Sequence, residues 1–290
     1  MKTKGIILAG GSGSRLYPMT SIFSKQLQIV YDKPMIYYPL ATLMLAGVKE
    51  VLLISTPKDT PNFEKLLGDG KRWGISIDYI IQDKPKGIAE AFIYGEKFIG
   101  DSQVCLILGD NLFYGKMDFL RRAIEANEGA TVFGYRVQNP ESYGVVEFDK
   151  NNNVVSIEEK PKKPKSDFAI PGLYIFDNSV VEKTLNLKPS PRGELEITDV
   201  QKEYLNLGKL NVEIMGRGIA WLDTGTPESM IEAGTFIHAV EKRQGRKIAC
   251  PEEIALGMKF ITKAEYLETV NRLPDCSYRD YCLRISDEYE

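Results

Sequence analysis

The sequence feature that most constrains the fold is an alternation between short apolar runs and amphipathic stretches. Residues 6–9 form an apolar run that precedes the amphipathic stretch 35–46, and the run 51–55 precedes the stretch 62–67. The order repeats through residues 75–80, 88–98, 104–108, 117–127 and 131–135. A buried strand followed by a helix with one apolar face is typical of a βαβ unit. The sequence therefore predicts a mostly parallel central sheet with helices on both faces, of the Rossmann-like α/β class, with ligands at the carboxyl ends of its strands.

The rhythm changes after Tyr135. Two alternating runs flank the turn-forming residues 149–153 and predict a β-hairpin inserted beside the main sheet. The run "FAIPGLYIFD" predicts one further strand, and a helix is expected near residues 179–187. Thr226 followed by Pro227 is typical of a helix start, and that helix should continue to Gln244.

Composition excludes several classes of function. A net charge of −3 over 290 residues leaves no basic field for nucleic acid or for an anionic membrane. No apolar run approaches the roughly 18 residues of a membrane span. Four cysteines without a C-x-x-C pair, and no signal peptide, favour the reducing cytoplasm. The single histidine, His238, excludes His-rich metal sites and argues against a Ser-His-Asp triad.

A glycine-rich loop follows the first predicted strand, in "LAGGSGSRLYP". It lacks the Gly-Lys-Ser/Thr of a Walker A loop, and a G-x-G-x-x-G frame begun at Gly11 ends on Leu16, which is too large for the dinucleotide fingerprint. A flexible anion nest with its own guanidinium remains, and Lys25 lies ten residues further on. A plain turn with a solvated arginine is the alternative, but the density of glycine favours phosphate binding. The predicted nucleotide-binding residues of this segment are Leu8, Gly10, Gly11, Ser12, Gly13, Ser14, Arg15 and Lys25.

Longer motifs resemble those of the sugar-phosphate nucleotidyltransferases, and most of all the thymidylyl branch of that family. The resemblance begins with "LAGGSGSRLYPMT", "SKQL" and "VYDKPMIYYPLATLMLAGV". It continues, in the family's order, through "QDKPKGIAEAF", "LGDNLFYG", "YGVVEFD", "IEEKPKKPKS", "GLYIFD", "SPRGELEITD", "WLDTGT" and "KIACPEEIA". It covers residues 5–257, so it is far more specific than any single motif.

The resemblance implies a reaction in which glucose 1-phosphate attacks the α-phosphorus of dTTP and yields dTDP-glucose and pyrophosphate. The attacking phosphate is already ionised at neutral pH, so the protein must supply orientation and charge neutralisation rather than a general base. Mg²⁺ is the implied cofactor, with Asp110 and Asp223 as its ligands. Each aspartate also fits an ordinary turn, which is the alternative for both.

The family pattern also implies roles for other residues. Arg15, Lys25, Lys160 and Arg192 match the catalytic cations, the first two on the triphosphate and the last two on the sugar phosphate. Gln82, Pro85 and Gly87 match positions that hold the base, together with Asp110 in the nucleotide site. The expected sugar-phosphate-binding residues are Asn111, Tyr143, Gly144, Glu159, Lys160, Ile170, Gly172, Tyr174 and Arg192. Without the motif order, the charged run 158–165 would read as a solvated face.

At the level of the whole chain, we expect a single nucleotidyltransferase domain over residues 1–250. Its nucleotide-binding half spans about 1–135 and its sugar-phosphate part about 136–227, and residues 251–290 form a helical tail with a regulatory or subunit-contact role. The resemblance further implies a homotetramer and feedback inhibition by dTDP-rhamnose. Two other functions stay open: a uridylyl- or cytidylyltransferase on another sugar phosphate, and a non-catalytic nucleotide-sugar sensor.

Overall fold

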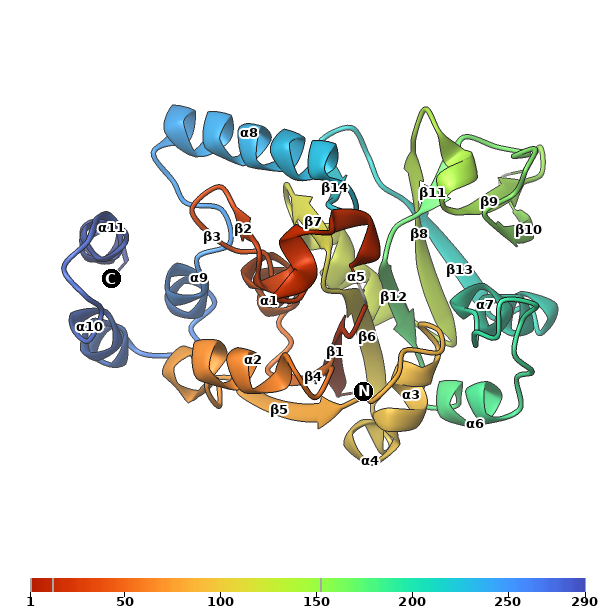
Figure 1. Ribbon diagram of the computed structural model, residues 1–290, viewed down its shortest axis with the longest axis horizontal. Helices are drawn as coiled ribbons and strands as arrows, with labels where there is room; N and C mark the ends of the chain where they lie inside the picture. Colours follow the sequence, from red (N-terminus) through yellow and green to blue (C-terminus); the bar gives the residue numbers. More distant parts are fainter. Residues whose placement is uncertain (1, 12, 152, 290) are drawn as a thin grey trace.

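A large mixed sheet forms the centre of the computed structural model, which describes residues 2–11, 13–151 and 153–289 (Figure 1). Within these residues its strands lie in the order β10-β9-β11-β8-β12-β6-β1-β4-β5, and β13 pairs with β8 as well. The strands are β1 (Thr3–Ala9), β4 (Glu50–Ser55), β5 (Ser76–Ile81), β6 (Gln103–Leu108), β8 (Ala130–Arg136), β9 (Gly144–Phe148), β10 (Val154–Glu159), β11 (Phe168–Ile170), β12 (Leu173–Phe176) and β13 (Leu210–Ile214).

Most strands of the sheet run in one direction. The neighbours β5, β4, β1 and β6 are parallel, and β13 is parallel to β8. Strand β12 lies between β6 and β8 and is antiparallel to both. Since β6 and β8 therefore point the same way, the expected mostly parallel α/β sheet is confirmed.

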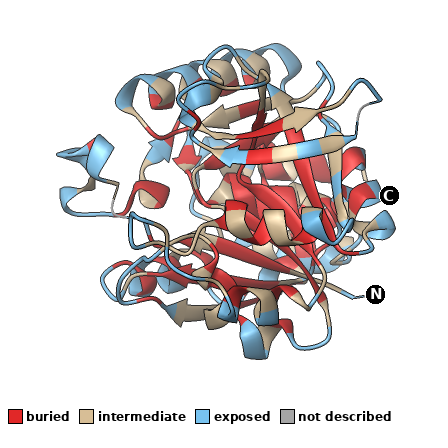
Figure 2. Ribbon diagram, turned by 90° about the vertical axis from the view of Figure 1, so that its right-hand side faces the viewer, coloured by how far each residue is buried: buried red, intermediate tan, exposed pale blue. Residues whose placement is uncertain are grey.

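Helices cover both faces because successive strand residues alternate between two cores. In β1, Ile7 packs into one core and Ile6 into the other, and Leu53 and Leu52 of β4 repeat the pattern. Figure 2 shows these strands as the buried interior. The helices on the first face are α1 (Tyr37–Leu45), α2 (Thr60–Leu67) and α5 (Asp118–Ala126), and those on the second are α3 (Glu90–Tyr94), α4 (Glu96–Ile99), α6 (Val180–Leu185) and α7 (Ile197–Asn206).

Three local expectations were wrong. The predicted single helix over 88–98 is divided at Gly95, where a methyl group would come within 2.9 Å of Ile6 Cδ1 on the sheet. The predicted single strand over 168–177 is two strands, β11 and β12, separated by Pro171 and Gly172 and paired with different neighbours. The β9–β10 hairpin does not lie beside the main sheet but extends it, because β9 pairs with β11.

Two small sheets were not predicted. Strand β7 (Asn111–Tyr114) pairs antiparallel with β14 (Ala220–Asp223), and β2 (Ile29–Val30) pairs with β3 (Lys33–Pro34). The long helix α8 (Pro227–Gln244) follows β14 directly. Its Thr226 cap is confirmed, since the Thr226 side chain accepts a hydrogen bond from the backbone of Ser229.

The C-terminal segment is helical, as expected, with α9 (Pro251–Gly257), α10 (Lys263–Asn271) and α11 (Ser277–Ser286). Figure 1 places these helices and the β9–β10 hairpin at opposite ends of the molecule. Helix α9 packs on α1, and Trp73 Nε1 donates a hydrogen bond of 3.0 Å to Glu252. Helices α10 and α11 share a separate core that includes Tyr266 and Cys282. None of the described helices is long and apolar enough to cross a membrane.

Candidate active site

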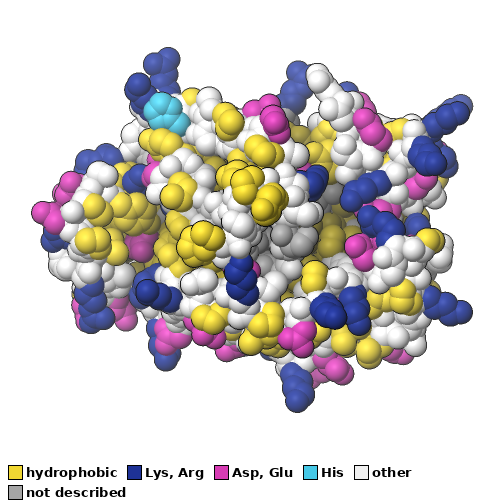
Figure 3. All heavy atoms as spheres, viewed as in Figure 1, with side chains coloured by type: hydrophobic (Ala, Val, Ile, Leu, Met, Phe, Trp, Pro, Cys, Tyr) yellow, Lys and Arg dark blue, Asp and Glu magenta, His cyan; other side chains and the backbone are white. Residues whose placement is uncertain are grey.

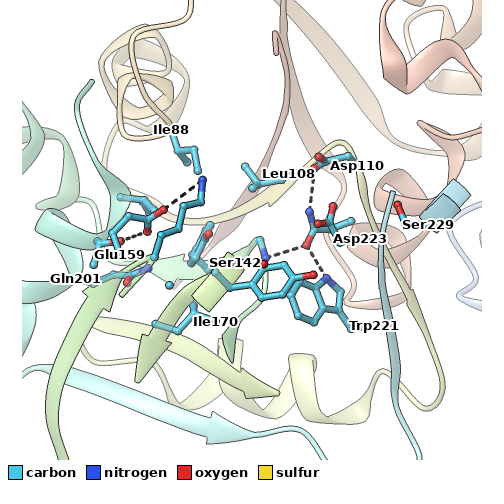
Figure 4. Close-up of a pocket in the computed structure, with 18 of the residues that line it drawn as sticks. Ile88, Leu108, Asp110, Ser142, Glu159, Ile170, Gln201, Trp221, Asp223 and Ser229 are labelled. Atoms are coloured by element: carbon cyan, nitrogen blue, oxygen red, sulfur yellow. Dashed lines mark hydrogen bonds and ion pairs between the residues drawn. The ribbon is translucent and has the colours of Figure 1, made fainter. Parts of the chain in front are cut away.

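A cavity of about 320 Å³ opens where β6 and β14 end and β7 and β12 begin, against the β9–β10 hairpin and α7 (Figure 4). Figure 4 shows Asp110 and Asp223 on one side of this cavity and Glu159 and Gln201 on the other. The structure brings together eleven of the residues selected from the sequence as its lining: Arg15, Asp110, Asn111, Tyr143, Gly144, Glu159, Lys160, Ile170, Gly172, Tyr174 and Asp223.

The two aspartates are held beside each other by the small β7–β14 sheet. Asp223 is the last residue of β14 and lies opposite Asn111, the first residue of β7. Thr224 then donates two hydrogen bonds to the carbonyl oxygen of Asp110, from its backbone at 3.2 Å and from its hydroxyl at 2.8 Å. The pair therefore depends on chain segments more than a hundred residues apart.

The two carboxyl groups differ in their electrostatic surroundings. Burial raises the pKa of Asp223, and the negative charge of Asp110 raises it further. Burial also opposes ionisation of Asp110, but the Lys25 ammonium and the hydrogen bonds from Lys25 and Asn111 outweigh it and hold the pKa of Asp110 below its usual value. Asp223 is thus a carboxylate that lacks a sufficient positive partner within the described protein.

The donor set fits Mg²⁺. The described residues contain no cluster of three or more His, Cys, Asp or Glu that could enclose a metal ion. Mg²⁺ commonly uses one or two carboxylates and takes its other oxygens from water and substrate phosphates. The repulsion between Asp110 and Asp223 is what a divalent cation between them would relieve.

Two cations from the N-terminal segment lie beside the aspartate pair. Lys25, the first residue of the short helix η3 (Lys25–Leu27), is almost fully buried and forms an ion pair with Asp110. Arg15 lies in η1 (Ser14–Leu16), and its guanidinium rests against Gly225, where a methyl group would come within 2.7 Å of an Arg15 nitrogen. The glycine of "DTGT" therefore makes room for Arg15.

Asn111 links several parts of the site. Its Nδ2 donates a hydrogen bond of 2.9 Å to Asp110, and its Oδ1 accepts from Gly172 at 2.9 Å and from Trp221 Nε1 at 2.7 Å. A methyl group at Gly172 would lie 2.9 Å from Asn111 Nδ2 and 2.6 Å from the Leu108 side chain. The bond from Asn111 fixes the orientation of the Asp110 carboxylate.

Glu159 and Lys160 form the opposite end of the cavity. Thr198 of α7 donates a hydrogen bond of 2.6 Å to Glu159 Oε2, and Lys160 Nζ lies 3.9 Å from Glu159 Oε1. Lys160 has a backbone φ of +44°, in the left-handed region that non-glycine residues seldom adopt. The charged run is therefore not a uniformly solvated face. Arg192 lies at the rim, half-exposed, and pairs mainly with Glu196 while coming within 4.0 Å of Glu159 Oε1.

Of the residues expected to hold the nucleotide, Arg15 and Asp110 line the cavity, and the others are not part of its lining. Gly10 follows β1 and Gln82 follows β5, so both lie at the carboxyl edge of the parallel strands. Gly87, at a φ of +114°, packs so tightly on Leu195 that a methyl group would come within 2.2 Å of its carbonyl oxygen. The remaining predicted positions are the half-buried Leu8 and Gly13 and the exposed Gly11, Ser14 and Pro85, while Ser12 lies outside the described residues.

Several lining residues were missed by the sequence reasoning. Thr198 and Gln201 come from α7, which that reasoning did not predict as a separate helix. Trp221 lies two residues before Asp223 in the quoted motif "WLDTGT", so the motif itself was an available signal. The other missed residues are Ile88, Leu108, Ser142, Ile197, Thr226 and Ser229.

A model of the nucleotidyl transferase family matches residues 4–240 of the chain. This match covers the whole sheet and both sides of the cavity. The chain therefore belongs to the nucleotidyl transferase family.

Individual relatives narrow the class. The chain is 55% identical to the glucose-1-phosphate thymidylyltransferase of Neisseria gonorrhoeae over 97% of this chain and 99% of that protein. It is 50% identical to the enzyme of the same name from Mycobacterium tuberculosis, over 97% and 98% of the two chains. Within the nucleotidyl transferase family, the chain groups with the glucose-1-phosphate thymidylyltransferases.

Solved structures agree. A crystal structure assigned as a glucose-1-phosphate thymidylyltransferase of Bacillus anthracis, in complex with sucrose, is 39% identical and superposes with a TM-score of 0.76, covering 81% of this chain and 94% of that chain. A UDP-glucose pyrophosphorylase in complex with UDP-glucose superposes with a TM-score of 0.73, covering 84% of this chain and 100% of the other. At 23% identity, the second likeness supports the fold alone.

Proposed function

We propose that this chain transfers a thymidylyl group from dTTP to glucose 1-phosphate and releases dTDP-glucose and pyrophosphate. The observation that carries the proposal is one cavity with the carboxylate pair and Arg15 at one end and the Glu159–Lys160 pair at the other. Lys25 joins the first end through its ion pair with Asp110. Two phosphate-bearing substrates can meet there, with the nucleotide along the glycine-rich loop and the sugar phosphate against the hairpin. The near-full-length similarity to named thymidylyltransferases supports the choice of base and sugar.

The residues supply orientation and charge neutralisation. A phosphate oxygen of glucose 1-phosphate forms a bond to the α-phosphorus of dTTP, and the bond from that phosphorus to the β-phosphate oxygen breaks. Lys160 and Arg192 hold the attacking phosphate, and Arg15 and Lys25 stabilise the charge that accumulates on the departing pyrophosphate. Mg²⁺, held by Asp110 and Asp223, would supply further neutralisation of the phosphate charge.

Glu159 positions the sugar. Its carboxylate accepts a hydrogen bond from Thr198 and keeps further lone pairs for sugar hydroxyls. Gly144 leaves space beside this carboxylate. A methyl group at that position would occupy the space, since it would lie 3.4 Å from Glu159 Oε2. Tyr174 and Ile170 form the buried floor of the same end.

Pyrophosphate release tests the reaction. The protein with dTTP, glucose 1-phosphate and Mg²⁺ should release pyrophosphate continuously, and removal of Mg²⁺ by a chelator should stop the release. No release with dTTP but rapid release with UTP or CTP would contradict the thymidylyl assignment in favour of the uridylyl or cytidylyl alternative. Binding of dTTP without turnover under any of these conditions would favour the sensor.

We also propose that a second cavity, of about 410 Å³, binds the feedback inhibitor dTDP-rhamnose in a cytoplasmic homotetramer. Its lining combines Tyr38, Tyr114, Arg246 and Lys247 with residues of α9. Aromatic rings and cations together suit a nucleoside diphosphate. Added dTDP-rhamnose should lower the rate of pyrophosphate release, and light scattering should give the mass of four chains. Competition only with glucose 1-phosphate or dTTP at the first cavity, or a monomeric mass, would contradict this proposal.

A further inference from the structure

The carbonyl end of the Gln82 side-chain amide has a defined direction in the structure. Gln82 is 1% exposed, and its backbone N–H is fixed by a hydrogen bond of 2.8 Å to the carbonyl oxygen of Ser55. Its Oε1 faces the first glycine of the loop, because a methyl group on Gly10 would lie 2.9 Å from that oxygen. Among the described residues, none donates a hydrogen bond to this oxygen. The carbonyl end of the amide is thus directed to where the nucleotide cradle begins.

Glu90 determines which end of the amide faces the cradle. Its Oε2 accepts a hydrogen bond of 2.7 Å from Gln82 Nε2 and another of 3.0 Å from the backbone N–H of Lys86. A carboxylate can only accept hydrogen bonds, so Gln82 must present its NH₂ group to Glu90. Without such a partner, an amide can turn over and exchange its donor for its acceptor.

We propose that Glu90 is a positioning residue that sets the base preference of the enzyme by fixing the Gln82 amide. This inference rests on the proposed function, in which Gln82 contacts the base. A carbonyl oxygen pointing to the base requires an N–H donor there. Thymine and uracil carry such a donor at N3, whereas N3 of cytosine is an acceptor and would face the oxygen without a hydrogen. A polar site that is left unpaired by the wrong base discriminates strongly against it.

Three substitutions at position 90 separate this role from a structural one. Glu90→Gln keeps an acceptor on which the Gln82 and Lys86 donors converge, so it should retain the preference. Glu90→Met has similar length but neither accepts from nor donates to the amide, so Gln82 is free to turn. Glu90→Lys presents a donor instead, which attracts the Gln82 carbonyl oxygen and turns the NH₂ group towards the base. Glu90 is only half-buried, so its surroundings can accommodate these side chains.

The measurement is kcat/KM for dTTP, dUTP and dCTP with glucose 1-phosphate. We expect the dTTP-to-dCTP ratio to fall about tenfold in Glu90→Met and about a hundredfold in Glu90→Lys, and to change less than about threefold in Glu90→Gln. The dTTP-to-dUTP ratio should be the same in all four proteins, because both bases carry the N3 donor. The KM for glucose 1-phosphate should not change.

The outcomes are distinct. Equal losses with all three nucleotides, leaving every ratio unchanged in Glu90→Met and Glu90→Lys, would show a merely structural role and overturn the inference. If Glu90→Lys does not fold, the comparison of Glu90→Met with Glu90→Gln decides. A wild-type protein that releases no pyrophosphate with any nucleotide would overturn the proposed function itself, which is a different result.

Discussion

At the scale of single residues, the site depends on side chains whose positions are set by a neighbour rather than by their own backbone. Arg15 is exposed, yet its guanidinium lies against Gly225. Asp110 is oriented by Asn111, and Gln82 by Glu90. Substitutions of these neighbours therefore test the geometry without removing the reactive groups.

Gly225→Ala should displace Arg15 while leaving the fold intact. The backbone of Gly225 is not in the left-handed region, so alanine is tolerated, but its methyl group would meet the guanidinium at 2.7 Å. We expect kcat/KM for dTTP to fall about tenfold, which corresponds to about 1.4 kcal/mol. In a double-mutant cycle, Arg15→Ala with Gly225→Ala should be no worse than Arg15→Ala alone. Additive losses would show that Gly225 acts through something other than Arg15.

Asp223→Asn should stabilise the protein in the absence of divalent cations. Since folding raises the pKa of Asp223, the folded chain binds this proton more tightly than the unfolded chain, and stability is lost as the pH rises through the folded-state pKa. Asparagine has no such loss. We expect the melting temperature at pH 7 to rise by about 2–4 °C, which corresponds to about 1 kcal/mol in a chain of this size. The gain should shrink as the pH falls towards ~3.9, the ordinary value for aspartate.

Added Mg²⁺ should reverse the order of the two proteins. The ion relieves the repulsion between two carboxylates in the wild type but finds only one in Asp223→Asn, so it should raise the wild-type melting temperature more. Equal stabilisation of both proteins by Mg²⁺ would contradict the assignment of Asp223 as a metal ligand.

At the scale of elements, two helices share the same N-terminal capping motif but begin in different parts of the molecule. Thr226 caps α8 and Thr262 caps α10, each in a capping box with the residue three positions later. Thr226 and Ser229 also line the first cavity, whereas α10 lies in the C-terminal segment. Substituting each threonine in turn therefore separates the stability that is lost with a helix cap from the activity that is lost when the cavity wall changes.

Thr226→Ala and Thr262→Ala should each lower the free energy of unfolding by about 1 kcal/mol. Urea denaturation measures this loss, and pyrophosphate release measures activity. Only Thr226→Ala should lower the activity, because the start of α8 forms part of the cavity wall. Equal activity in the two variants would show that the first turn of α8 has no role in the site.

The elements that the sequence predicted are those whose pattern is local. Strands β1, β4 and β6 are buried on both faces, so they read as continuous apolar runs. Strands β7 and β14 have four residues each, and the pairing of Asp223 with Asn111 joins distant segments, so no local pattern could reveal it. The motifs pointed directly to Asp110, Asp223 and Glu159. Thr198 stands in the quoted motif "SPRGELEITD", but its contact with Glu159 depends on how α7 packs against β10, which no local pattern reveals.

At the scale of the whole molecule, hydrophobic side chains form an exposed group on the surface and a separate core in the C-terminal helices. On the face shown in Figure 3, hydrophobic side chains gather over the segment that includes η1, where Tyr17 and Ile22 are 74% and 65% exposed. The C-terminal helices have a core of their own, joined to the main sheet mainly through α9. The assignment of residues 251–290 as a separate tail stays a prediction, and it concerns how cooperatively the two parts unfold.

Tyr266→Ala tests that cooperativity in the full-length chain. Tyr266 is fully buried between α10 and α11, and its hydroxyl donates a hydrogen bond of 2.8 Å to the carbonyl oxygen of Cys282. Removing so large a buried side chain costs about 3–5 kcal/mol, and Tyr266 belongs to the C-terminal core. We expect hydrogen exchange to increase over residues 259–289 while β1, β4 and β6 stay protected.

The rate of pyrophosphate release should change less than about threefold in the same variant, because no residue of α10 or α11 lines the first cavity. Tyr289→Ala is the matched control, since its side chain lies at the end of the chain and is partly exposed. Loss of protection in the central strands, in step with the tail, would mean instead that the whole chain unfolds as one unit and that the C-terminal helices are part of the catalytic domain.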